Sequence, residues 1–107
     1  MKVIWSPHAE ELLGDIVLGI AADCSVEDAI RWELDIRTTT TSLEQHPLMG
    51  HPVPASCFAT IPNDFDRLRQ VFCGPYRIVY EPTDVACYIY SIRHSRMMVR
   101  SSDTSWR

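Results

Sequence analysis

The sequence predicts a single α+β domain in which two helices pack on a small twisted antiparallel sheet. Residues 68–72, 76–80 and 87–94 are rich in the β-branched and aromatic residues that favour strands. Turn residues separate these segments: Gly74-Pro75 first, then Pro82-Thr83-Asp84. Two segments with helical spacing precede them. A chain of 107 residues can bury one hydrophobic core, so we expect one domain over residues 1–107.

The first helix is predicted to follow a short N-terminal strand at residues 2–6. Ser6 can cap the helix and Pro7 suits its first position. The apolar positions then recur at i, i+3, i+4, i+7, i+8 and i+11, which is the pattern of one buried stripe. These positions are Ala9, Leu12, Leu13, Ile16, Val17 and Ile20.

A second helix is predicted to begin after Ser25, because Ser25 and Asp28 resemble a capping box. The β-branched run at residues 38–41 lowers helix propensity, but we expect the helix to reach about His46, before Pro47. One face can gather Ala29, Trp32, Ile36, Thr40 and Leu43. The short connection between the helices predicts an antiparallel hairpin that covers one face of the sheet.

The remaining segments show little periodicity. Residues 47–66 carry four prolines and Gly50 and are predicted to form a long loop. Residues 101–107 are predicted to be a tail, in which Trp106 either packs back on the domain or marks a contact surface. The expected order of elements is therefore β-α-α-β-β-β.

The charge of the chain is divided unevenly around its net value of −4. Residues 1–66 carry three basic and eleven acidic side chains, a net of −8, whereas residues 67–107 carry seven arginines and three acidic side chains, a net of +4. Nine of the ten basic residues are arginine, whose planar group suits bidentate contact with carboxylate or phosphate. The half that contains the three strands is therefore a cationic pole that favours phosphate or an acidic partner, although a divided charge is also an ordinary way for a protein to stay soluble.

Several classes of site and location are disfavoured by the sequence. Cys24, Cys57, Cys73 and Cys87 are spaced too widely for paired zinc ligands, and we expect them to be reduced and mostly packing residues. We expect no metal and no cofactor, because His46, His51 and Cys57 form only an irregular set. No apolar run approaches the length of a membrane span or a signal peptide, so a cytoplasmic location without membrane contact is expected.

The strand alternation places the candidate functional residues. Arg77 is predicted to lie on the sheet face opposite Tyr76, Ile78 and Tyr80. Arg93 and His94 close the last strand, and Arg96 follows it. Cationic groups are therefore expected to collect on and beside the sheet.

Three blocks of the sequence are informative when taken together. The first is Ile4-Trp5-Ser6-Pro7 with Ala9 and Leu12-Leu13, and the second is Leu43 with Pro47-Leu48-Met49-Gly50. The third is Tyr76-Arg77-Ile78-Val79-Tyr80 with Ile92-Arg93-His94-Ser95-Arg96. In their order and spacing, these blocks resemble the RelE/ParE superfamily of toxins from type II toxin-antitoxin systems. The details are closer to the ParE branch than to the RelE branch. The resemblance implies a plasmid-stabilisation toxin that is made with a cognate antitoxin.

The resemblance leaves the mechanism open between two classes. A ParE-like chain implies inhibition of DNA gyrase by protein contact, without catalysis. A RelE-like chain implies ribosome-dependent, metal-independent cleavage of messenger RNA. In that case Arg77 matches the family's strand arginine, and His94 or Arg96 lies near the position of its C-terminal catalytic residues. The terminal tyrosine that many of these ribonucleases use has no counterpart after Ser95, which favours the gyrase interpretation.

In the gyrase interpretation the arginines chiefly bind the antitoxin or the target, and the candidates are Arg69, Arg77, Arg93 and Arg96. An acidic, ParD-like antitoxin tail that folds on binding is expected to wrap the toxin. A third alternative is an inactive relative that only binds its antitoxin. Direct DNA binding by this chain alone is not expected, because neither predicted helix is basic.

Overall fold

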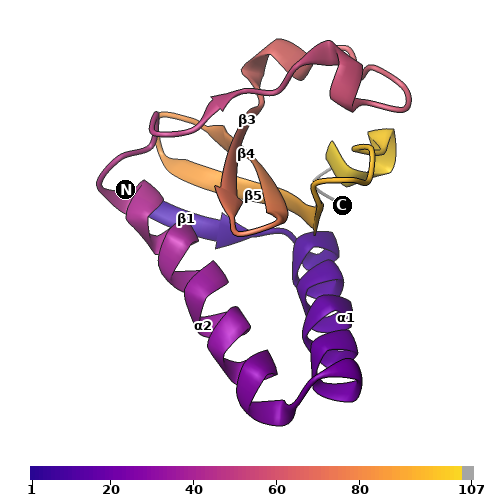
Figure 1. The fold of residues 1–107 in the computed structure, drawn as a ribbon. Helices are drawn as coiled ribbons and strands as arrows, with labels where there is room; N and C mark the ends of the chain where they lie inside the picture. Colours follow the sequence, from indigo (N-terminus) through magenta and orange to yellow (C-terminus); the bar gives the residue numbers. More distant parts are fainter. Residues whose placement is uncertain (105–107) are drawn as a thin grey trace.

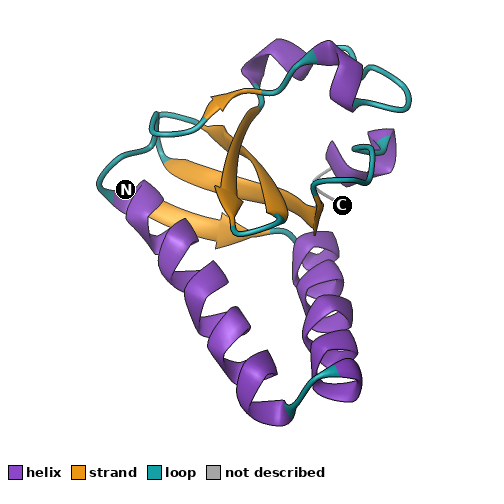
Figure 2. Ribbon diagram, viewed as in Figure 1, coloured by secondary structure: helices purple, strands orange, loops and turns teal. Residues whose placement is uncertain are grey.

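The computed structural model describes residues 1–104, which form two helices beside one five-stranded sheet (Figure 1). The predicted α+β class is confirmed, and Figure 2 shows both helices on one side of the strands. The elements are β1 (Lys2–Trp5), α1 (Pro7–Asp23), α2 (Val26–Thr41), β2 (His51–Pro52), β3 (Arg69–Cys73), β4 (Tyr76–Pro82) and β5 (Ala86–His94), with 3-10 turns at Ser42–Glu44, Ala55–Cys57, Phe65–Arg67 and Ser101–Thr104.

The strands lie in the order β1-β5-β4-β3-β2. β3, β4 and β5 form the predicted antiparallel meander, with Cys73 opposite Tyr76 at the first turn and Tyr76 opposite His94. The sheet as a whole is mixed, because the N-terminal strand β1 pairs with β5 in parallel. Strands that are linked by a hairpin must be antiparallel. Two helices separate β1 from the meander, so the direction of β1 is set by packing and not by the chain connection.

Both helix starts are confirmed by their caps. The Ser6 hydroxyl accepts a hydrogen bond of 3.0 Å from the Ala9 N–H, and the Ser25 hydroxyl accepts one of 3.0 Å from the Asp28 N–H. α2 ends at Thr41 and gives way to a 3-10 turn, so the prediction that it reaches about His46 is wrong. Hydroxyls at its end bond back to helix carbonyls, Thr40 to Arg37 and Ser42 to Thr38, and such bonds compete with a regular helix.

The sheet carries a hydrophobic core on each face. Helix residues pack on one face against Ile78, Tyr80, Ile89 and Ile92. The opposite face packs against the long loop and the chain after β5 through Val53, Phe58, Leu68, Val79 and Val99. The predicted loop of residues 47–66 is therefore structured: it contributes β2, and a bridge joins Phe58 to Val99.

The prediction of a tail from residue 101 is wrong for residues 101–104. Asp103 is fully buried within the turn at Ser101–Thr104, where its carboxylate binds Arg93 in β5, His8 in α1 and the N–H of the adjacent Arg100. Trp106 lies outside the described residues. Within residues 1–104, no helix is long and apolar enough to cross a membrane.

Candidate functional site

Arg77 is fixed to the turn that follows β5. It lies opposite Arg93 in the β4–β5 ladder, and its guanidinium donates to the carbonyl oxygens of Met97 at 3.1 Å and Ser95 at 3.4 Å. The same guanidinium lies 5.7 Å from the centre of the Phe72 ring. Tyr76, Ile78 and Tyr80 face the helices as predicted. Arg77 therefore holds the chain after β5 against the sheet.

Arg93 is bound by a buried carboxylate. Its Nε and Nη2 donate to Asp103 at 2.6 and 2.9 Å, and only 14% of its side chain is exposed. Asp103 also lies 2.7 Å from His8 Nε2 and accepts 3.1 Å from the Arg100 N–H. Burial alone raises the pKa of Asp103, but the hydrogen bonds from Arg93, His8 and Arg100 outweigh it and lower that pKa. The same contact with Asp103 raises the pKa of Arg93.

His94 and Arg96 form the outer end of this cluster. His94 Nδ1 accepts a hydrogen bond of 3.1 Å from the Arg96 N–H, so this ring nitrogen is an acceptor in the turn. Arg96 is exposed. The structure thus places Arg77, Arg93, His94 and Arg96 together at one end of the sheet, and we call these four residues the cationic end.

Arg69 lies away from the cationic end. It pairs with Tyr80, whereas Arg77 lies three residues earlier in β4 and pairs with Arg93. The Arg69 guanidinium donates to the carbonyl oxygens of Gly50 at 2.6 Å and Leu48 at 3.4 Å. Arg69 therefore stabilises the loop after α2. The structure does not bring it together with Arg77, Arg93, His94 and Arg96.

A groove runs between α1 and the cationic end. Two adjoining cavities of about 200 and 260 Å³ form it, and they share Asp15, Ile16 and Tyr76 as lining residues. The first is also lined by Leu12, Ile92, Arg93, His94 and Met97, and the second by Gly19, Ile20, Asp23 and Cys24. Most of the lining side chains are apolar, and Asp15, Asp23 and Arg93 add charge, which suits an amphipathic peptide.

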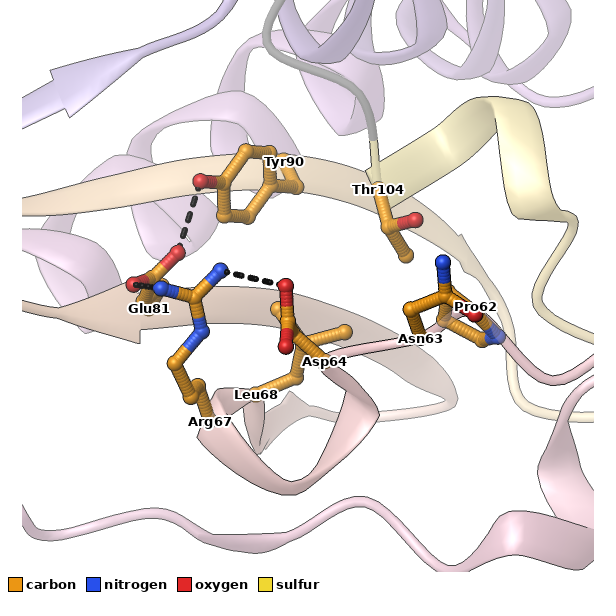
Figure 3. Close-up of a pocket in the computed structure, with 8 residues that line it drawn as sticks. All are labelled: Pro62, Asn63, Asp64, Arg67, Leu68, Glu81, Tyr90 and Thr104. Carbon is orange, nitrogen blue, oxygen red and sulfur yellow. Dashed lines mark hydrogen bonds and ion pairs between the residues drawn. The ribbon is translucent and has the colours of Figure 1, made fainter.

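A smaller polar cavity of about 160 Å³ lies on the opposite side of the sheet (Figure 3). The Tyr90 hydroxyl donates to Glu81 at 2.8 Å, and the Arg67 guanidinium approaches Asp64 at 3.2 Å and Glu81 at 3.7 Å. Burial and the Glu81 hydrogen bond raise the pKa of Tyr90 to about 12. These contacts connect the loop at residues 62–68 to the sheet.

Among the described residues, no three histidine, cysteine or carboxylate side chains gather in a way that could hold a metal ion. His46, His51 and Cys57 form no such group. The four cysteines are free thiols, of which Cys73 and Cys87 are buried.

Sequence reasoning missed Asp103 and His8, which hold Arg93 in place. The two lie 95 residues apart, and Asp103 stands in a polar segment without periodicity. No local pattern indicates that such a carboxylate is buried.

Two comparisons with known proteins bear on this fold. Residues 3–99 match the family described as the ParE toxin of the type II toxin-antitoxin system, parDE. A solved structure described as the chromosomal ParDE toxin-antitoxin system from P. aeruginosa aligns with a TM-score of 0.70 at 18% sequence identity. The alignment covers 88% of this chain and 95% of that chain, and it supports the fold alone. No match was found among curated proteins.

Proposed function

The chain belongs to the ParE toxin family of type II toxin-antitoxin systems, and on that premise we propose that it inhibits DNA gyrase by protein contact and is neutralised by a cognate antitoxin. One observation favours contact over catalysis: Arg77 and His94 are already used in structural hydrogen bonds with the turn after β5. A ribonuclease needs such groups free to stabilise charge on a phosphate and to move protons. We place the toxin in the cytoplasm, where gyrase acts.

The proposed antitoxin site is the groove together with the cationic end. Apolar side chains of an antitoxin helix would fill the cavities beside Tyr76 and Ile16. Its carboxylates would pair with the exposed Arg96, in the turn that Arg77 holds against the sheet. Arginine binds carboxylates in a bidentate geometry, which gives such pairs orientation as well as energy. A disordered acidic tail that folds on the toxin meets both requirements.

The first experiment is pulse-labelling of DNA and protein synthesis in bacteria just after the toxin is induced without an antitoxin. We expect DNA synthesis to fall first and purified toxin to inhibit gyrase supercoiling of a relaxed plasmid. Early loss of protein synthesis instead, with cleavage of ribosome-bound messenger RNA, would support the RelE-like alternative. Normal growth at full expression would indicate an inactive, antitoxin-binding relative.

The double variant Arg77→Ala/Arg96→Ala separates contact from catalysis. We expect this variant to keep its gyrase inhibition to within about threefold and to bind the antitoxin about tenfold more weakly. Arg67→Ala is the matched control, because it removes an exposed arginine whose partners are Asp64 and Glu81. Complete loss of toxicity in a folded double variant would argue for ribonuclease chemistry.

A further inference from the structure

α2 carries three large aliphatic side chains in solvent. Val26, Ile30 and Leu34 are 61, 63 and 63% exposed. Their spacing of four residues places them along one side of the helix. α2 packs on the domain through other residues, including Ala29, Ile36 and Thr40, which are buried. We call Val26, Ile30 and Leu34 the α2 stripe.

Within residues 1–104, the α2 stripe belongs to neither hydrophobic core. Single exposed aliphatic residues are normal, but three in register form the surface that a second helix recognises. Valine and isoleucine are also poorer helix formers than lysine or glutamate, so helix propensity does not favour them at exposed positions. An interaction surface for another molecule is the remaining physical reason.

The charge around the α2 stripe selects the partner. Residues 7–41, which contain both helices, carry eight acidic side chains and only two arginines. Arg37 is already paired with Glu10 at 2.7 Å and Glu33 at 3.6 Å. A net charge of −6 repels nucleic acid, anionic membranes and a second copy of the same hairpin. It attracts a basic polypeptide.

We propose that the α2 stripe binds a basic amphipathic helix of the protein that the toxin inhibits. This inference rests on the proposed inhibition of gyrase by contact. It assigns the acidic antitoxin and the basic target helix to different surfaces of the toxin. The antitoxin occupies the groove and the cationic end, whereas the target occupies the outer side of the acidic hairpin. Apolar residues on the target helix would cover Ile30 and Leu34, with lysine or arginine on its flanks.

The test compares Ile30→Ala/Leu34→Ala with the wild-type toxin. Alanine keeps the helix propensity and both side chains are exposed, so the fold should be retained, as thermal unfolding would verify. Val85→Ala is the matched control, because Val85 is an aliphatic residue 72% exposed in the β4–β5 turn. The readouts are gyrase supercoiling, growth arrest on induction, and rescue of growth by the co-expressed cognate antitoxin.

We expect the double alanine variant to need about tenfold more protein for half-inhibition of gyrase and to lose growth arrest, while Val85→Ala behaves as wild type. Growth arrest retained by the double alanine variant overturns the proposal. An intact inhibition with weakened antitoxin rescue also overturns it, because the stripe then belongs to the antitoxin. A change in oligomeric state with unchanged inhibition assigns the stripe to a second copy, against the proposal.

A pair of charged variants at one position tests the sign of the partner. Leu34→Lys should weaken inhibition more than Leu34→Glu, because only lysine repels a basic helix. The reverse order contradicts the proposal. If wild-type toxin arrests growth without inhibiting gyrase, the gyrase proposal fails. Growth arrest by the Ile30→Ala/Leu34→Ala and Leu34 variants then still shows whether the α2 stripe binds the protein that the toxin inhibits. If wild-type toxin does neither, both proposals fail.

Discussion

Asp103 connects the two ends of the described chain. Its carboxylate is fully buried and binds Arg93 at the end of β5, His8 in the first turn of α1 and the N–H of Arg100. A buried carboxylate is costly unless it is paired and hydrogen-bonded, and these contacts meet that condition. Asp103 therefore stabilises the position of the C-terminal turn relative to α1 and the sheet.

Asp103→Asn should lower the free energy of unfolding by roughly 2–4 kcal/mol at neutral pH, because Arg93 would lose its charged partner. Urea unfolding of the variant measures this change. Thr104→Ala is the matched control, since the Thr104 hydroxyl only donates to the Ser101 carbonyl within the same turn. Equal stability of the Asp103 variant and wild type would show that the ion pair contributes nothing net.

The lowered pKa of Asp103 also predicts an acid-sensitive part of the stability. A carboxyl group whose pKa is lower in the folded state stabilises the fold fully above its unfolded pKa of about 3.9, and loses that contribution as the pH falls through the folded pKa. The free energy of unfolding should therefore fall less steeply below about pH 4 in Asp103→Asn than in wild type. Parallel curves for the two proteins would contradict this assignment.

At the scale of elements, Tyr80 fixes the loop after α2 to the central strand β4. Its buried hydroxyl donates to the Pro47 carbonyl at 2.8 Å and accepts from the Gly50 N–H at 3.0 Å, and burial raises its pKa. A Cβ at Gly50 would lie 2.5 Å from the Gln70 carbonyl and 2.7 Å from the Tyr80 hydroxyl, so this position requires glycine. The close approach determines where the loop begins its path to β2.

Tyr80→Phe should destabilise the protein by about 1–3 kcal/mol, because the Gly50 N–H and the Pro47 carbonyl lose a buried partner. The midpoint of urea unfolding checks this value. The control is Phe72→Leu, which changes a partly exposed ring on β3. A stability loss no larger than that of Phe72→Leu would refute the role of the Tyr80 hydroxyl.

The start of α2 depends on Ser25. Its hydroxyl accepts from the Asp28 N–H, one of the helix N–H groups that lacks a partner within the helix. Ser25→Ala should cost about 1 kcal/mol in unfolding free energy, and Ser25→Asp should recover most of it. Thermal or urea unfolding of both variants measures the difference. If Ser25→Asp is as unstable as Ser25→Ala, the cap does not stabilise α2.

At the scale of the whole molecule, the two charge poles lie on different parts of the fold. The acidic excess lies in the half that contains the helical hairpin, and the arginines lie in the half that contains β3, β4, β5 and the following turn. The toxin therefore has an acidic region and a basic region. Long-range attraction between complementary surfaces mainly accelerates association and is weakened by salt.

Antitoxin binding should be strongly salt-dependent. We expect the association rate of wild-type toxin with its antitoxin to fall by about tenfold between roughly 50 and 500 mM salt, because exposed charges farther apart than the Debye length are then screened. Arg77→Ala/Arg96→Ala should show a smaller fall. Surface plasmon resonance at several salt concentrations measures both rates, and identical salt dependence in the two proteins would exclude the cationic end from the antitoxin site.

The sequence alone determined the helix starts, the meander and the family, because these depend on local chemistry. Ser6, Pro7 and Ser25 act within one helical turn, and Gly74-Pro75 sets a turn between adjacent strands. Only the tertiary structure decided the direction of β1 and the burial of Asp103, because both depend on contacts between residues far apart in the chain, which leave no periodic pattern. The end of α2 was also not predicted, because it depends on a local competition between the helix and its own hydroxyls. The same distinction holds at the cationic end: the sequence indicates which arginines are present, and the fold decides that Arg93 is held by Asp103 while Arg96 faces solvent.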